Sequence, residues 1–171
     1  MGLVSQDTLK QLDEDSFGPE RVAEHLGFFP ELFQFLKESE QVMGRTRPVV
    51  AYATAVTVWA FRQSGGQPLR KLPVGLPQVF WERIAQGEAG EHLTECLDVL
   101  EPELWRYVQT LIRAAAIKEE WDRREMASAS LVYGPVLLAS TLAFWPEDKL
   151  PELEETLRSH GLGSPDSNAL W

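Results

Sequence analysis

The chain has 171 residues, 44% hydrophobic and 25% charged, which is the composition of a folded domain rather than of a disordered segment. Its formal net charge of −10 argues against nucleic acid as a partner, because affinity for a phosphate backbone comes largely from lysine and arginine. The single cysteine, Cys96, cannot form an internal disulfide, and the first residues do not form a basic and apolar signal segment. We therefore expect a cytoplasmic protein.

The first thirty residues predict short N-terminal helices within 3–27. An apolar stripe over 3–12 is typical of a short docking helix, and acidic residues follow it. Ser16 and Pro19 indicate the start of the next helix, because serine caps free amides and proline tolerates the first turn. Gly27 indicates its end, since glycine readily adopts the left-handed conformation that stops a helix.

Two runs without a charged residue, 48–61 and 126–145, dominate the rest of the chain. We interpret both as buried core helices. The second run is long enough to cross a membrane, but its serines and threonines favour the core of a soluble bundle. Its internal Gly134-Pro135 pair predicts a kink or a split, because proline removes one backbone donor and clashes with the preceding turn.

Proline begins four further predicted helices, at Pro30, Pro77, Pro102 and Pro151, and an apolar pair follows within three residues at the first three. The distance from Pro30 to Pro102 is nearly equal to the distance from Pro77 to Pro151. One uncharged run lies between Pro30 and Pro77 and the other between Pro102 and Pro151, and two arginines precede each run. We infer two repeat-like halves, 30–87 and 102–161, packed with pseudo-two-fold symmetry so that each completes the core of the other. The alternative is that Pro-Glu-Leu is simply a common way to begin a helix.

These elements predict an all-α, single-domain helical bundle of about seven to nine helices over 1–161. A connecting helix at 91–100 joins the two halves. Residues 162–171 form a C-terminal tail that ends in two apolar residues, Leu170 and Trp171.

The most specific chemical pattern is a group of cations in an otherwise acidic chain. The segment 45–71 has no carboxylate and contains five basic residues, Arg45, Arg47, Arg62, Arg70 and Lys71. The first two precede a helix, whose dipole disfavours cations at that end. We therefore expect either a site for a small anion or ordinary surface ion pairs with neighbouring helices.

A cysteine and a histidine form the catalytic alternative. His92 and Cys96 are four residues apart on a predicted helix, where an imidazole could activate a thiol. The surrounding sequence does not match a cysteine-nucleophile signature, and a lone cysteine is usually a small buried hydrophobe. The chain also has no zinc pattern and no phosphate-binding loop. We expect no metal, no cofactor and no catalysis.

Residues 22–27, Val-Ala-Glu-His-Leu-Gly, with the short helix that follows, resemble the helix-turn-helix of bacterial regulators over some twenty residues. The resemblance implies a recognition helix at 31–36. That segment is apolar and acidic and offers little to base edges or phosphates, so DNA binding stays an alternative only.

Aromatic residues and the tail suit protein partners. The chain has six tryptophans and eight phenylalanines, and aromatic anchors commonly dominate interfaces. Those near helix starts are Phe28, Phe29, Trp81 and Trp105. The tail residues Leu170 and Trp171 could dock onto another chain, although both groups could equally pack within the fold.

The sequence thus predicts a non-catalytic protein-interaction or assembly module that forms a homodimer. The rival hypothesis is a protein that binds a small apolar or anionic ligand in a pocket between the two core helices, with the arginines at its mouth.

Overall fold

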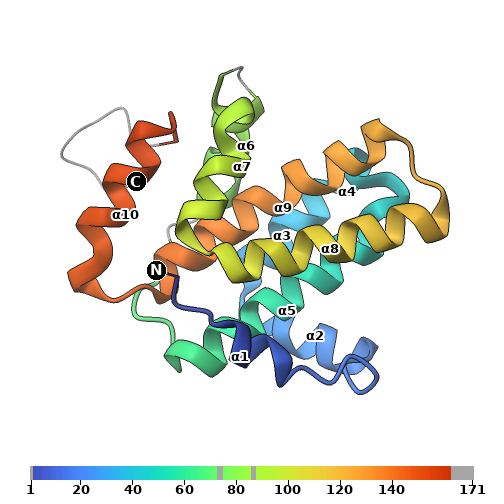
Figure 1. The fold of residues 1–171 in the computed structure, drawn as a ribbon, viewed down its shortest axis with the longest axis horizontal. Coiled ribbons are helices and arrows are strands. Elements are labelled where there is room, and N and C mark those ends of the chain that lie inside the picture. The colour runs from blue at the N-terminus through green and yellow to red at the C-terminus, as the bar shows by residue number, and fades with distance from the viewer. Residues whose placement is uncertain (1, 73–74, 86–87, 163–171) are drawn as a thin grey trace.

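The computed structural model describes residues 2–72, 75–85 and 88–162. Within them the chain is an all-α, single-domain bundle without a β-strand, as predicted (Figure 1). In chain order the elements are α1 (Gln6–Lys10), α2 (Pro19–Phe28), α3 (Pro30–Glu38), α4 (Glu40–Met43), a 3-10 turn (Gly44–Thr46), α5 (Arg47–Gly65), α6 (Leu76–Ala85), α7 (Glu88–Leu100), α8 (Pro102–Glu119), α9 (Arg123–Phe144), a second 3-10 turn (Glu147–Lys149) and α10 (Leu150–Ser159). The described residues contain more α-helices than the seven to nine predicted, because the count includes two very short ones, α1 and α4, of five and four residues.

The two uncharged runs form α5 and α9, which pack directly against each other in the core. Both helices bury small and branched apolar side chains completely, among them Ala55, Val56 and Ala139. A hydrogen bond between the Thr57 and Tyr133 hydroxyls, with 2.6 Å between Oγ1 and Oη, joins the two helices. Each buried hydroxyl thus has a hydrogen-bond partner, whereas a buried polar group without one costs about 1–3 kcal/mol of folding free energy.

Helix α9 has well-defined ends and an uninterrupted middle. Asp122 caps its start, because its carboxylate accepts from the backbone N–H of Glu125 while the Glu125 carboxylate accepts from that of Asp122. The helix ends at Phe144, and the next residue, Trp145, has an extended backbone (ψ 139°) that suits a residue before proline. Pro135 lies inside the helix without splitting it.

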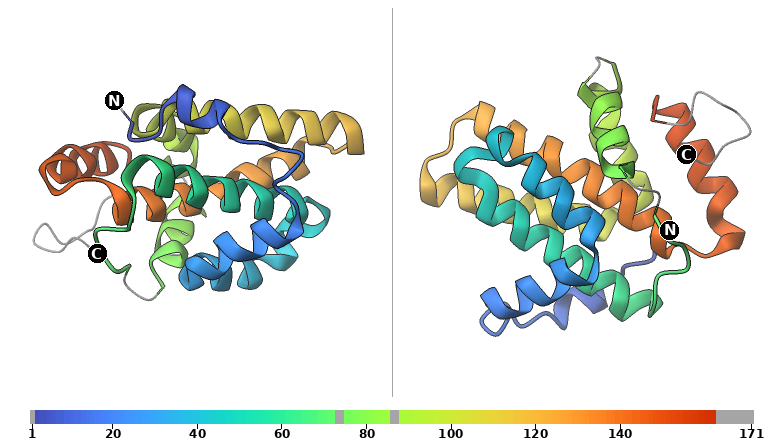
Figure 2. Two further views of the ribbon diagram at one scale, coloured as in Figure 1. Left: turned by 90° about the horizontal axis from the view of Figure 1, so that it is seen from below. Right: turned by 180° about the vertical axis from the view of Figure 1, so that it is seen from behind.

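Helix α9 is also the centre of the molecule. Helices α4, α5, α6, α7 and α8 all contact it (Figures 1 and 2). Among the helices that the structure describes, it alone is long and apolar enough to cross a membrane, and 78% of its most apolar stretch is buried inside the fold. Burial on every side is typical of a core helix.

Two predicted boundaries were wrong. Gly18, not Ser16, is the N-cap of α2, and the helix continues through Gly27 to Phe28. Phe29 breaks the helix (φ −127°, ψ 78°) because it precedes Pro30, and the residue before a proline is driven out of the helical region. Gly44 follows α4 with a positive φ of 55°, which glycine adopts readily.

The two predicted halves agree in the order of their elements but not in their contacts. Each has a helix that starts at proline, then a helix that contains the uncharged run and then a short amphipathic one. Helix α6 packs across α9, in the other half, whereas α10 packs on α7. Pseudo-two-fold symmetry therefore stays a prediction.

A buried carboxylate attaches the N-terminal segment to the bundle. Glu101, between α7 and α8, is fully buried and accepts from the backbone N–H groups of Leu3 (2.7 Å) and Val4 (2.9 Å). It also accepts from Nε1 of Trp145 at 2.9 Å. Leu162, predicted as the first tail residue, is likewise buried, and Nη1 of Arg83 donates to its carbonyl at 2.9 Å.

Candidate functional site: an apolar groove between α2, α3 and α5

The five basic residues of the predicted anion site do not lie together in the structure. Arg45 and Arg47 lie at the N-terminal end of α5, whereas Arg62 lies at its other end, about 22 Å away along a helix that rises 1.5 Å per residue. Arg70 and Lys71 follow in the loop after α5. No single anion can therefore contact both ends of this set.

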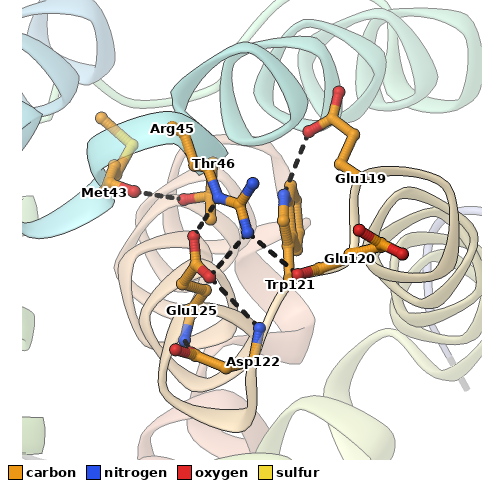
Figure 3. A network of polar contacts seen from close by, with 8 residues as sticks. All are labelled: Met43, Arg45, Thr46, Glu119, Glu120, Trp121, Asp122 and Glu125. Carbon is orange, nitrogen blue, oxygen red and sulfur yellow. Dashed lines mark hydrogen bonds and ion pairs between the residues drawn. The ribbon is translucent and has the colours of Figure 1, made fainter.

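Arg45 belongs to a polar network at the start of α9 (Figure 3). Its Nε and Nη2 form a two-pronged ion pair with the carboxylate of Glu125, and Nη2 also donates to the carbonyl of Glu120 at 3.0 Å. The guanidinium and the capping contact with Asp122 together lower the pKa of Glu125 to about 2. Arg47 pairs with Glu40. These two arginines thus form the surface ion pairs expected as the alternative to an anion site.

Arg62 and Arg70 also have partners inside the protein. The Arg62 guanidinium lies 4.0 Å from the ring centre of Phe28, and Nη1 is 3.4 Å from Nδ1 of His25. Arg70 Nη1 donates to the carbonyls of Leu142 and Trp145, each at 2.7 Å. Both carbonyls lie at the C-terminal end of α9, where a cation also suits the helix dipole.

Arg70 and exposed Lys71 do line one hollow, of about 370 Å³, together with Phe28 and Phe29. The carboxylate-bearing residue Glu31 lines it as well. Because Arg70 already donates to two carbonyls and Glu31 carries a negative charge, the hollow has little to offer an anion.

His92 and Cys96 do not form a catalytic pair. Cys96 is fully buried, and burial raises the pKa of its thiol to about 12, so the reactive thiolate is disfavoured. The His92 side chain is half exposed, and its Nδ1 lies 3.6 Å from the Glu95 carboxylate instead. Among the described residues, no group of three or more histidine, cysteine, aspartate or glutamate side chains could hold a metal ion.

The arrangement of α2 and α3 differs from a helix-turn-helix. Only Phe29 separates the two helices, whereas the motif needs a turn of three or four residues. The segment 31–36 buries Leu32, Phe35 and Leu36, and the residues that it leaves uncovered, Glu31, Phe33 and Gln34, include no cation for a phosphate backbone.

The aromatic residues near helix starts are mostly internal. Phe29 and Trp105 are buried, and Phe28 and Trp81 are partly buried. Phe33 is instead 44% exposed. Leu170 and Trp171, the predicted partner-binding residues of the tail, lie outside the described residues.

Phe33 lies in an apolar groove of about 500 Å³. Helix α2 forms one wall, and Phe33 of α3 and the first turns of α5 form the rest. The lining consists of Pro19, Val22, Ala23, Leu26, Gly27, Phe33, Pro48, Ala51 and Tyr52. We refer to these nine residues as the α2–α5 groove.

The α2–α5 groove is open to solvent and carries no charge. Its residues Pro19, Ala23, Gly27 and Pro48 are exposed, and buried Leu26 lies deeper in the same lining. The sole side-chain polar group among the nine residues is the Tyr52 hydroxyl. The two core helices touch directly, so this groove lies beside α5 rather than in the predicted position between α5 and α9.

Sequence reasoning missed the groove because its residues come from three separate segments. The one local indication was the position of Phe33, next to Leu32 in a nine-residue helix that buries Leu32, Phe35 and Leu36. At 100° per residue, Phe33 must point away from at least part of that buried face. Comparisons of the chain with protein-family models, with curated proteins and with solved structures gave no match.

Proposed function

We propose that the protein is a non-catalytic interaction module that binds an amphipathic helix of a partner protein in the α2–α5 groove. The observation that carries the proposal is the uncharged, solvent-open lining of this groove. Exposed apolar surface rimmed by polar residues commonly marks a binding site. A groove with this lining suits a helix that presents apolar side chains at i, i+3, i+4 and i+7.

The lining also favours a protein segment over a small anionic ligand. Orientation of a small polar ligand needs several well-placed polar groups, and the groove supplies only one hydroxyl, that of Tyr52. Glu20 and Glu24 are exposed on α2 beside the lining residues Pro19 and Ala23. A bound helix with lysine or arginine along that edge would therefore gain favourable charge contacts.

The experiment is a selection of helical peptides from a displayed amphipathic library, with affinities then measured by fluorescence anisotropy. We expect selected peptides to share an apolar i, i+3 or i+4, i+7 pattern. Ala23→Arg fills the groove from an exposed position and should weaken binding about tenfold or more, which corresponds to the loss of about 1.4 kcal/mol. Phe33→Ala removes the exposed aromatic anchor and should have a similar effect.

Ala114→Arg is the matched control. Ala114 is also an exposed helical alanine, but it lies on α8 and does not line the groove. Its substitution should leave the affinity unchanged. Equal binding by the Ala23→Arg and Ala114→Arg proteins, or a library that yields no helical binder, would contradict the proposed function.

A further inference from the structure

A buried histidine holds the groove helix α2 against α5. His25 is only 4% exposed, and its ring stacks on Phe17 with a centroid separation of 5.5 Å and an interplanar angle of 8°. On its other side, Nη1 of Arg62 lies 3.4 Å from its Nδ1. The residue thus joins α2 both to the segment before the helix and to α5.

The hydrogen-bond partners fix the protonation state of His25. A guanidinium can only donate, so Nδ1 must carry the lone pair and the ring proton must lie on Nε2. Nε2 is buried, and it has no hydrogen-bond partner among the described residues. The contact with Arg62 therefore favours a neutral imidazole with its proton on Nε2.

Protonation of the His25 ring would place a positive charge next to that of Arg62. The added proton would occupy Nδ1, which would replace the hydrogen bond from Arg62 with contact between two cations. Arg21, whose guanidinium lies 4.9 Å from the Phe17 ring centre, adds a third positive charge nearby, and Glu24 is the one nearby group that favours the charged ring. Burial, followed by the two arginines, lowers the pKa of His25 despite Glu24.

Opening of helix α2 would remove its packing on α5 but would leave the centre of the core covered. This helix lies at the edge of the bundle, where its main helix contacts are with α5 and α3 (Figure 2). Its N-cap, Gly18, provides no side-chain cap. Helix α9, in the centre, does not depend on contact with α2 for its burial.

We propose that His25 is a proton-sensitive switch that favours the packing of α2 on α5 when neutral and favours the release of α2 when protonated. Release would dismantle the α2–α5 groove, because five of its nine lining residues lie on α2. The release of α2 itself is independent of the proposed function. Only its consequence for partner binding rests on that function.

Linkage gives the sign and the slope of the pH dependence of α2 opening. When α2 opens, His25 reaches water and regains its ordinary pKa of 6.5, so the open state binds protons more tightly than the closed state. The equilibrium constant for opening is therefore independent of pH above 6.5. Below this value it rises about tenfold per pH unit, until the pH falls to the pKa of His25 in the closed state.

Hydrogen exchange measured by mass spectrometry tests the switch at about pH 7.5 and about pH 5.5, with each rate corrected for its intrinsic pH dependence. We expect the protection of α2 to fall at the lower pH, by up to about tenfold, while that of α9 is unchanged. His25→Phe keeps a ring to stack on Phe17 but cannot titrate, so its α2 protection should be independent of pH. His92→Gln, at an exposed histidine, should behave as the wild type.

A direct titration keeps the test decisive if His25→Phe does not fold. In the wild-type protein, the His25 ring signal in NMR spectra should titrate below pH 6.5, and the α2 amide signals should shift with the same midpoint. A His25 pKa at or above 6.5 overturns the proposal, as does equal α2 protection at both pH values. An equal loss of α2 protection in His25→Phe also overturns it.

Discussion

At the scale of single residues, the fully buried Glu101 joins two parts of the chain, since it accepts three hydrogen bonds. Its donors come from the N-terminal segment and from Trp145, just after α9. Burial raises the pKa of Glu101, although its donors and the charge of Lys149 act in the opposite direction. The same low-dielectric surroundings that raise this pKa make an unpaired donor there costly.

We predict that Glu101→Leu destabilises the protein by about 3 kcal/mol or more, because it leaves the N–H groups of Leu3 and Val4 and the Trp145 indole without an acceptor. Glu101→Gln keeps one carbonyl oxygen and should cost less. Urea unfolding followed by tryptophan fluorescence measures both. Glu103→Gln is the control, since its i, i+3 pair with Arg106 lies at the surface and contributes about 0.5 kcal/mol or less. A similar loss in all three variants would show that Glu101 has no special role.

At the scale of elements, helix α7 approaches α9 closely only because residue 134 is glycine. A Cβ atom at Gly134 would lie 2.8 Å from Cδ2 and 3.1 Å from Cδ1 of Leu93, which is buried. Both distances are shorter than ordinary carbon contacts. The glycine beside Pro135 therefore serves interhelical packing, a role that does not require it to bend the helix.

Gly134→Ala should destabilise the protein by about 1 kcal/mol, because overpacking of about 1–3 kcal/mol exceeds the gain of about 1 kcal/mol in helix propensity. Leu93→Ala alone should cost about 2–5 kcal/mol. The double variant should lose less than the sum of the two by about 1 kcal/mol or more, because the new methyl group occupies space that the leucine vacates.

Urea unfolding of the four proteins in this double-mutant cycle measures the coupling. Gly27→Ala provides the control, since a Cβ there meets nothing within 4 Å, and it should be neutral or stabilising and additive with Leu93→Ala. Additive losses for Gly134→Ala and Leu93→Ala would show that the two residues do not limit the approach of α7 to α9.

The helices themselves were largely predictable from local sequence. Pro30 and Pro102 are the first residues of α3 and α8, as expected, because proline has the right φ for a first turn and lacks a donor that would be unsatisfied there. The break at Ser39, which separates α3 from α4, was not predicted. Its backbone (φ −93°, ψ 6°) lies just outside the helical region, and no glycine or proline marks it.

At the scale of the whole molecule, contacts between distant residues could not be predicted. Arg45 pairs with Glu125, which is 80 residues away, so the sequence could offer an ion pair only as one of two alternatives. The α2–α5 groove likewise depends on how α2, α3 and α5 come together. Periodicity predicts which face of a helix is apolar, but it does not predict which apolar residues a neighbour will leave uncovered.

The sequence also predicts that the whole molecule forms a homodimer. Its net charge suggests how to test this prediction. Two copies with a formal charge of −10 each repel one another, so a homodimer formed through apolar surface should strengthen as salt screens the repulsion. Light scattering coupled to size exclusion should therefore give a mass that rises from 19.3 kDa towards twice that value with protein concentration and with salt.

Two variants locate the contact of such a dimer. If two copies meet through the α2–α5 groove, Ala23→Arg should hold the mass at 19.3 kDa under conditions in which Ala114→Arg dimerises. If they meet through Leu170 and Trp171, removal of these two residues should have that effect instead. A constant mass of 19.3 kDa for the wild-type protein at every concentration and salt level would rule out the homodimer and leave the groove to a different protein.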